Sequence, residues 1–325
     1  MKVLVTGGTG FLGSHLVEAL LKKKYSVRCI IRNPNNLKWL NNLDCEIIRG
    51  DCVSKECLYN IASDVDYVFH LAGLVRAKKI EELVETNAVG TRNLVEAVFE
   101  KNKQIKKFVY ISSQAAAGPS TNGKPKTESA EPNPVSEYGK SKLCGELEVL
   151  KFKDAMPIVI LRPPAIYGPR DKDIFVFFEQ VKKGFFFLPK KEKLINISYV
   201  SDICDGIIAA AESKQTNGEI YFIGDDTVYS WRKLGEVLTD VANPKTRMIR
   251  IPEFVFYVSA LFSEVSALIK GKPALVSFDK LKEIKQNSWF FSADKAKKDF
   301  GYSPKISLEE GIKITYNWYL KNGWL

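Results

Sequence analysis

Tyr138 and Lys142 have the residue types and the spacing needed for proton transfer near neutral pH. The segment that contains them has a helical pattern, so their side chains would lie one turn apart on the same face. Free tyrosine has a pKa of about 10, and a fixed ammonium group nearby stabilises the phenolate and lowers that pKa. We therefore expect Tyr138 to act as an acid or base. Ser113, with Ser112 as the competing serine, follows a predicted strand and would hydrogen-bond the substrate oxygen.

A glycine-rich turn follows the first predicted strand. Lys2–Thr6 is a nearly all-apolar run, typical of a strand buried on both faces of a parallel sheet. It leads through Gly7, Gly10 and Gly13 into a helical pattern. Gly7 permits a sharp turn, Gly10 lets a pyrophosphate approach the backbone, and Gly13 lets the helix pack closely on the strand. The free N–H groups and dipole of the helix start would attract phosphates, so this context predicts a dinucleotide site.

The stretch TGGTGFLG at residues 6–13 resembles the TGGxGFxG fingerprint of the extended short-chain dehydrogenase/reductase family. Further matching motifs follow in the family's order: HLAG at 70–73, NAVGTRN at 87–93, YGKSK at 138–142, LRPPAIYGP at 161–169 and FGYSPKISLEEGI at 300–312. The resemblance covers essentially the whole chain and is strongest over residues 3–170. Members similar to dihydroflavonol-4-reductase and 3-beta-hydroxysteroid dehydrogenase resemble it most.

This resemblance implies a Rossmann domain that binds NAD(H) or NADP(H), and it assigns roles to individual residues. Ser113, Tyr138 and Lys142 would be catalytic, with Lys142 also holding the nicotinamide ribose and Asn87 supporting the surroundings of the lysine. His70 is expected to hold position at a strand end, and no metal site is expected. The cofactor-binding residues would be Gly7, Thr9, Gly10, Phe11, Leu12, Gly13, Arg32, Lys38, Asp51, Cys52, Leu71, Ala72, Gly73, Ile111, Tyr138, Lys142, Pro163, Ala165 and Ile166.

The end of the second predicted strand, Ser26–Arg32, indicates which dinucleotide is bound. NAD-preferring members of the family carry an acid there to hold the ribose 2′-hydroxyl. This chain has Arg32 instead, with Arg28 and Lys38 nearby in sequence. A guanidinium group pairs well with a 2′-phosphate. The sequence therefore favours NADP(H), with NAD(H) as the alternative in which Arg32 only stacks on the adenine.

Apolar runs and helical patterns alternate along the chain and predict an α/β fold. Strands are expected at residues 2–6, 26–32, 45–49, 66–70, 106–112, 157–162 and 219–223, in a Rossmann-type, doubly wound parallel sheet of about seven strands. Residues 1–170 would form the dinucleotide-binding domain, joined by the strand near 219–223. Residues 171–325 would form mainly a smaller, mixed α/β substrate domain. Long helices are expected over Glu81–Lys101 and over Ser230–Ala242, the latter capped by Ser230.

Composition limits the partners of this chain of 325 residues. The 48 basic and 38 acidic residues give a net charge of +10, which we interpret as a lysine-rich surface, and no basic block interleaved with aromatics indicates nucleic-acid binding. The six cysteines form no Cys-x-x-Cys pair and are expected to be free thiols. The first strand begins at residue 2, so we expect no signal peptide and a cytoplasmic protein. The family resemblance implies a homodimer through Glu85–Lys101 and Glu137–Lys151.

Glu253–Ile269 is strongly apolar but contains Glu264, which makes it a poor membrane span. A helix in the core or beside a pocket is favoured. The alternative is an interfacial helix that makes peripheral contact with a membrane, an interpretation that the nearby Lys270 and Lys272 support.

Departures from the patterns of related enzymes reduce the number of reactions expected for the small-molecule substrate of this chain. The Asp-Glu pair of sugar-nucleotide dehydratases is replaced by Gln114 and Ala115, and Ala115 and Ile195 stand where epimerases carry threonine and arginine. Arg170, Lys190 or Lys191 could substitute for that arginine. Three apolar stretches, Phe175–Phe178, Phe185–Leu188 and Phe254–Phe262, indicate either an apolar cleft or ordinary core.

We expect an NAD(P)-dependent oxidoreductase that transfers hydride between nicotinamide and a carbonyl or secondary alcohol of a hydrophobic, dihydroflavonol- or sterol-like substrate. A nucleotide-sugar epimerase that uses the same Ser-Tyr-Lys triad is the alternative. A non-catalytic NAD(P)-sensing protein is the third reading.

Overall fold

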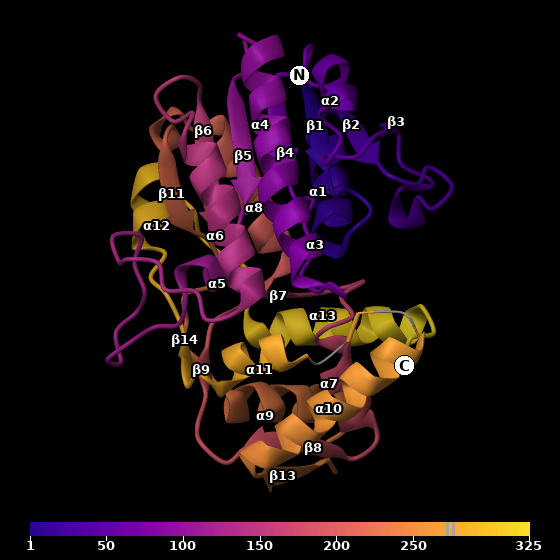
Figure 1. Cartoon of the computed structure of the whole chain (residues 1–325). Coiled ribbons are helices and arrows are strands. Elements are labelled where there is room, and N and C mark those ends of the chain that lie inside the picture. The colour runs from indigo at the N-terminus through magenta and orange to yellow at the C-terminus, as the bar shows by residue number, and fades with distance from the viewer. Residues whose placement is uncertain (271–272, 275–276) are drawn as a thin grey trace.

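A seven-stranded parallel sheet forms the centre of the upper part of the molecule in Figure 1. The computed structural model describes residues 1–270, 273, 274 and 277–325. The order across the sheet is β11-β6-β5-β4-β1-β2-β3, which reverses between β1 and β4 and is therefore doubly wound, as predicted. The strands are β1 (Lys2–Thr6), β2 (Ser26–Ile31), β3 (Glu46–Arg49), β4 (Tyr67–His70), β5 (Lys107–Ile111), β6 (Ile158–Arg162) and β11 (Glu219–Phe222).

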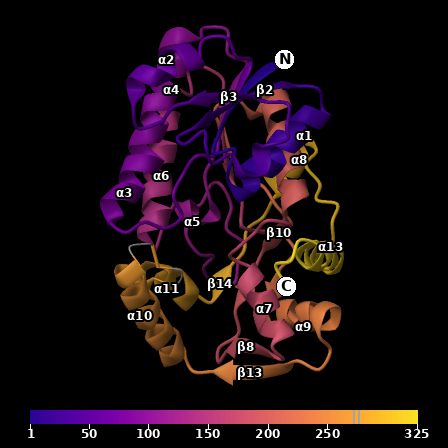
Figure 2. The same cartoon turned by 90° about the vertical axis from the view of Figure 1, so that its right-hand side faces the viewer.

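Helices cover both faces of this sheet, and alternation along the strands explains why both faces are apolar (Figure 2). Val3 and Val5 of β1 pack in one buried cluster with residues of α1 (Phe11–Lys22) and α8 (Val200–Glu212). Leu4 points to the other face and packs with residues of α2 (Lys55–Ile61), α4 (Gly90–Lys101) and α6 (Glu137–Leu150). A buried apolar layer therefore lies on each face of the sheet.

The C-terminal elements form a second group below the sheet in both views (Figures 1 and 2). Its strand β8 (Phe185–Pro189) pairs with β13 (Arg247–Ile251) in parallel. Two further small sheets hold β7 (Ala165–Tyr167) with β10 (Ile197–Tyr199), and β12 (Tyr229–Ser230) with β9 (Leu194–Ile195) and β14 (Ser288–Trp289). The helices of this half are α7 (Phe175–Lys182), α9 (Trp231–Ala242), α10 (Glu253–Lys270), α11 (Phe278–Lys285) and α13 (Leu308–Lys321), whereas α12 (Asp294–Phe300) packs beside β11 of the central sheet (Figure 1). The predicted Ser230 cap is present, since its hydroxyl accepts the Lys233 N–H.

The long helix predicted over residues 81–101 is present as one continuous helical segment, made of α3 (Ile80–Val84), a π-helical turn η2 (Glu85–Val89) and α4. Of the two alternatives for Phe175–Phe178 and Phe185–Leu188, the structure favours core of the C-terminal half, because Phe178 and Phe186 are fully buried. Helix α8, beyond residue 170, packs on α1 and the central sheet, which the prediction had not anticipated. The domain division near residue 170 stays a prediction.

Candidate active site

The turn between β1 and α1 has little room for side chains at its glycine positions. Gly7 has a φ of 73°, and a Cβ added to Gly13 would lie 2.1 Å from the Gly7 carbonyl oxygen. Gly10 occupies the N-cap position and provides no side-chain cap, so the first N–H groups of α1, at Phe11 and Leu12, have no side-chain acceptor there. These uncapped N–H groups and the glycine cradle fit the pyrophosphate of a dinucleotide. Thr9 lies in the same turn.

A hydrogen-bond chain fixes the loop after β4 against this turn. The Ala72 N–H donates to Thr6 Oγ1 (3.0 Å), which contacts His70 Nδ1 (2.7 Å). On the other side of the ring, His70 Nε2 contacts Thr91 Oγ1 (2.9 Å), whose proton goes to the Asn87 carbonyl (2.7 Å). Thr91 therefore accepts from Nε2–H, and Nδ1 accepts from Thr6. Complete burial lowers the His70 pKa to about 3, so a neutral imidazole holds these loops in place.

The π-helical turn places Asn87 beside the lysine. The Asn87 side chain accepts the Leu74 N–H (2.7 Å) and donates to the Leu74 carbonyl and to Ser141 Oγ (2.9 Å each). A Cβ on Gly73 would lie 2.9 Å from Asn87 Oδ1 and 3.7 Å from Lys142 Nζ. A side chain at position 73 would therefore crowd Asn87 and contact Lys142.

Lys142 is buried and faces the ends of two strands. Its Nζ donates to the carbonyl of Ile111, the last residue of β5 (2.7 Å), and lies 4.3 Å from the centre of the Tyr110 ring. Burial lowers the pKa of Lys142 to about 7, and the nearby Glu146 carboxylate acts in the opposite direction. Lys142 is thus an ammonium group whose proton is held weakly in the absence of a further anion.

Tyr138 stands in the first turn of α6, and that turn is capped from outside the helix. The Asp279 carboxylate of α11 accepts the N–H groups of Glu137 (2.8 Å) and Tyr138 (3.3 Å). Ser136 Oγ accepts the Gly139 N–H (3.0 Å). Burial raises the Tyr138 pKa to about 12, while a hydrogen bond with the Ser113 side chain acts against this rise.

The two neighbouring serines have different partners. Ser112 donates its hydroxyl proton to the carboxylate of Glu146, which is buried and paired with Arg162. Arg162 binds that carboxylate with Nε (2.9 Å) and Nη2 (2.6 Å). Ser113 instead caps the short helix α5 (Gln114–Ala117) by accepting the Ala115 N–H (3.1 Å), and its side chain reaches Tyr138. Ser113 is therefore the serine that shares a site with the tyrosine.

The residues expected at the adenosine end lie at the carboxyl ends of β2 and β3. Arg32 and Lys38 are exposed, and neither has an ion-pair partner in the part of the chain that the structure describes. Asp51 accepts the N–H of Val53 (3.1 Å), and Cys52 is buried next to Gly90. Arg32 is close enough to Cys52 to influence its thiol electrostatically.

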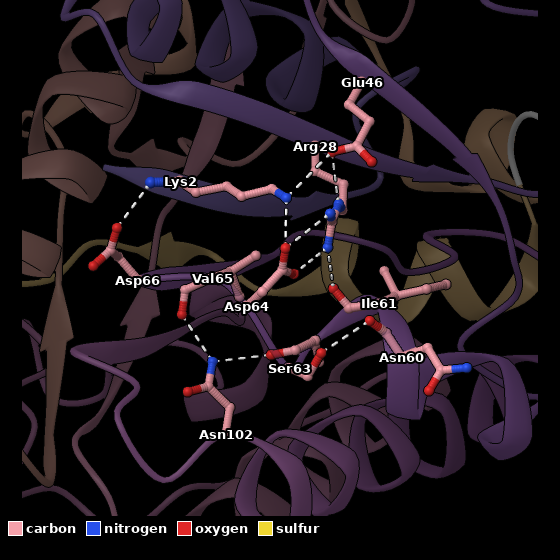
Figure 3. Close-up of polar contacts among 11 residues, drawn as sticks. Lys2, Arg28, Glu46, Asn60, Ile61, Ser63, Asp64, Val65, Asp66 and Asn102 are labelled. Carbon is pink, nitrogen blue, oxygen red and sulfur yellow. Dashed lines mark hydrogen bonds and ion pairs between the residues drawn. The ribbon is translucent and has the colours of Figure 1, made fainter.

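Arg28, which is close to Arg32 in sequence, is not part of this group. Figure 3 shows it among acidic residues near the amino ends of the strands. Its guanidinium binds Glu46 (2.8 Å), Asp64 (2.5 Å) and the Ile61 carbonyl (2.9 Å). Because Arg28 lies in the middle of β2, its side chain passes over the sheet face and away from the carboxyl edge.

The remaining predicted contacts also lie at this carboxyl edge. Leu71 directly follows β4, and its N–H donates to the Thr6 carbonyl (3.3 Å). Pro163 follows β6, and its carbonyl accepts the Gln114 N–H (2.8 Å). Ala165 and Ile166 open β7, where Ala165 is exposed and Ile166 half-buried. The structure therefore brings the predicted residues from six strand ends to one edge of the sheet.

Two features of the site were missed by the sequence reasoning, and one suggested ligand is bound elsewhere. Asp279 caps α6 although it lies more than a hundred residues away in sequence, and no sequence pattern near either segment indicates this contact. Glu146 lies one further turn beyond Lys142 on α6, so the same helical spacing that connects Tyr138 with Lys142 could have found it. Arg170, suggested as a phosphate ligand, is bound instead to Glu18 of α1 and lies over the Trp39 ring.

Comparisons with known proteins agree with this geometry. The sequence pattern of the NAD dependent epimerase/dehydratase family matches residues 3–224. The chain is 27% identical to a ceramide reductase of Caulobacter vibrioides, over 99% of this chain and 96% of that protein. It is 28% identical to the mouse sterol-4-alpha-carboxylate 3-dehydrogenase, decarboxylating, over 97% and 90% of the two chains.

Among solved structures, UDP-glucuronic acid 4-epimerase from Bacillus cereus in complex with NAD superposes with a TM-score of 0.77. It is 27% identical and covers 98% of this chain and 96% of that one. The matched region contains the glycine turn and the Ser113, Tyr138 and Lys142 cluster. The chain therefore belongs to the NAD dependent epimerase/dehydratase family, the extended short-chain dehydrogenases/reductases, and is an enzyme that depends on a nicotinamide dinucleotide.

Proposed function

We propose that this enzyme catalyses hydride transfer between NADP(H) and a carbonyl or secondary alcohol of a hydrophobic substrate. The nicotinamide, when bound, supplies or accepts the hydride. Ser113 orients the substrate oxygen by a hydrogen bond, and Tyr138 gives it a proton during reduction and removes one during oxidation. Lys142 stabilises the phenolate and holds the ribose, while Asn87 keeps the lysine environment ordered.

The observation that supports this assignment best is that the two neighbouring serines have different partners. The hydroxyl of Ser112 is bound to Glu146, whereas the side chain of Ser113 interacts with Tyr138. Lys142, one turn after Tyr138 on α6, is held at the end of β5 by its bond to the Ile111 carbonyl. These groups support a proton-transfer site at the carboxyl edge of the sheet, near the uncapped helix start that fits a pyrophosphate.

Three observations support a hydrophobic substrate over a sugar nucleotide. Arg170, one of the three cations suggested to hold a diphosphate, is bound to Glu18 at 2.5 Å. Ala115 is buried in α5 and provides no hydroxyl. The ceramide reductase and sterol dehydrogenase that resemble this chain over nearly its whole length are named for lipid substrates.

The preference for NADP(H) rests on Arg32. The guanidinium is exposed at the end of β2 and is free of ion pairs within the described residues, whereas Arg28 is fully occupied. An unpaired guanidinium can bind a 2′-phosphate with two parallel hydrogen bonds.

A nucleotide-sugar epimerase is the second candidate, because the NAD complex of UDP-glucuronic acid 4-epimerase matches nearly the full chain. The deciding experiment follows NADPH absorbance with purified protein and a panel of 3-ketosterols, long-chain ketolipids and UDP-, GDP- and dTDP-sugars. Net NADPH loss with a ketone, abolished by Tyr138→Phe, supports the reductase. Sugar interconversion without net change of cofactor would assign the epimerase instead.

We also propose a homodimer through residues 85–101 and 137–151, by analogy with the family. Leu147, on the outer face of α6, is 54% exposed and would be covered in such a pair. Light scattering is expected to give twice the monomer mass of 36.6 kDa, and a monomer would contradict the proposal.

A further inference from the structure

Helix α10 presents a continuous apolar stripe to the outside of the molecule. Its exposed members recur every three or four residues and so share one helical face: Phe254, Tyr257, Val258, Leu261, Phe262, Val265 and Ile269. Phe262 is 70% exposed and Phe254 65%. Scattered exposed apolar residues are ordinary, but a row of seven on one helix marks an interaction surface.

The opposite face of α10 is packed, which fixes the direction of the stripe. Ala260 is fully buried, and Phe256 lines a small surface pocket together with Leu281 and Ile284 of α11. Tyr257, at the border of the stripe, also touches this pocket. The Glu264 carboxylate accepts the Phe278 N–H at the start of α11 (2.8 Å). The one acidic residue in the middle of α10 is therefore turned toward α11 and leaves the stripe without negative charge.

Cationic side chains lie at the amino end of the stripe. β13 leads into α10 through Pro252, and its Arg247 and Arg250 are exposed, as is Ile249 between them. Lys190 and Lys191 follow β8, whose last residue pairs with the last residue of β13, and both lysines are exposed. These four cations form no ion pair within the parts of the chain described above. Figures 1 and 2 both place β8, β13 and α10 at the same end of the molecule.

We propose that α10, with the end of β13, docks flat onto an anionic lipid bilayer. Apolar side chains on one helix face with arginine and lysine beside them are the combination that inserts into the boundary between head groups and acyl chains. A second copy of the chain is a poorer occupant, because a protein of net charge +10 would bring further cations against these four. No helix among the described residues is long and apolar enough to cross a membrane. The side chain of Lys270 and the whole of Lys272, which supported this idea in the sequence, lie outside the described residues.

This docking goes beyond the proposed function and connects with its site. α10 packs on α11, and Asp279 of α11 holds the N–H groups of Glu137 and Tyr138 at the start of α6. A bilayer in contact with α10 would therefore lie next to α11, which carries the Asp279 that caps the helix turn of Tyr138. It would be at the end of the molecule opposite β2 and β3.

The test is flotation of the purified full chain with vesicles of phosphatidylcholine alone and with 30% phosphatidylglycerol. We expect recovery with the anionic vesicles that falls with rising salt. Leu261→Glu combined with Phe262→Glu is expected to lower the apparent affinity about tenfold or more, since two charges would enter the apolar boundary. Arg247→Glu with Arg250→Glu is expected to abolish the difference between the two vesicle compositions.

Leu320→Glu, at a leucine of α13 that is 46% exposed, is the matched control and should float like the unchanged protein. Circular dichroism and melting temperature verify that each variant is folded. Equal flotation of the Leu261/Phe262 variant and the unchanged protein would overturn the proposal. So would absence of vesicle binding together with a change from dimer to monomer in that variant, which would make the stripe an interface between copies.

Discussion

Replacing the two neighbouring serines by alanine, one at a time, should separate catalysis from stability. Ser113→Ala removes the hydroxyl that the structure directs to Tyr138 and that we propose orients the substrate oxygen. Ser112→Ala removes a donor to the buried Glu146 carboxylate and touches nothing we place in contact with substrate. The two changes are chemically identical and one residue apart, so each is the control for the other.

The expected magnitudes follow from what each hydroxyl bonds. Loss of a donor to an oxygen that gains charge in the transition state lowers kcat by about 10²- to 10³-fold. Loss of one hydrogen bond to a buried carboxylate costs about 1.5–3 kcal/mol of stability, since Glu146 keeps its two bonds from Arg162 (2.9 and 2.6 Å). That corresponds to a melting temperature lower by roughly a few degrees. We expect Ser112→Ala to change kcat by less than about threefold, under about 0.7 kcal/mol in activation free energy.

The assay measures kcat for ketone reduction and the calorimetric melting temperature for both variants. Ser113→Ala also removes the cap of α5 and should cost about 0.5–2 kcal/mol of stability. A large loss of kcat in folded Ser113→Ala, with nearly unchanged kcat and lower melting in Ser112→Ala, would support the assignment. If Ser112→Ala lost as much kcat as Ser113→Ala while remaining folded at the assay temperature, the division of labour between the serines would be refuted.

Three further predictions concern the cofactor and the proton. Arg32→Ala should weaken NADPH binding about ten- to a hundredfold and leave NADH binding unchanged, measured by fluorescence titration; an equal loss for both cofactors would contradict a role at the 2′-phosphate. Gly13→Ala should abolish dinucleotide binding and lower the melting temperature, because the added Cβ would lie 2.1 Å from the Gly7 carbonyl oxygen. The control Gly90→Ala, whose nearest contact would be at 3.4 Å, should have the melting temperature of the unchanged protein. A Gly13 variant that bound NADPH as tightly as the unchanged protein would contradict the proposed pyrophosphate site. The kcat/KM for NADPH in ketone reduction should fall as pH rises through about 7, since burial lowers the pKa of Lys142 to about that value and the ammonium form is lost above it. Glu146→Gln removes the carboxylate that raises this pKa and should move the fall to lower pH, and an unmoved profile would show that the profile reports another group.

The sheet could be predicted because its signal is local. Each strand is a short apolar run between turn residues, and the first glycine turn identifies which end of the sheet binds the ligand. The Tyr138–Lys142 spacing is likewise local, since both side chains belong to one helix. The same reasoning placed Arg32 at the edge of the sheet, whereas the direction of the Arg28 side chain depends on Asp64, an acid from a different part of the chain.

Contacts between segments that are distant in sequence could not be predicted from the sequence. Ser112 and Ser113 are adjacent residues of one type, and the contacts that distinguish them, Ser112 with Glu146 and Ser113 with Tyr138, come from other segments of the chain. The π-helical turn at Asn87 is not encoded by any apolar period, because it depends on the fit of Asn87 to Leu74 and Ser141. The aromatic stretches were ambiguous for a related reason: Phe178 is buried by tertiary packing, while Phe262 has the same residue type and faces outward.

The central claim, net hydride transfer assisted by Tyr138, is tested most directly with NADPH deuterated at nicotinamide C4. The reduced product of a ketone that passes the absorbance screen is analysed by mass spectrometry, with Tyr138→Phe as control. We predict one deuterium on the new carbinol carbon for each NADPH oxidised, and loss of this transfer in the control. A sugar nucleotide epimerised with no deuterium gained and no NADPH consumed, while no ketone is reduced, would contradict the account.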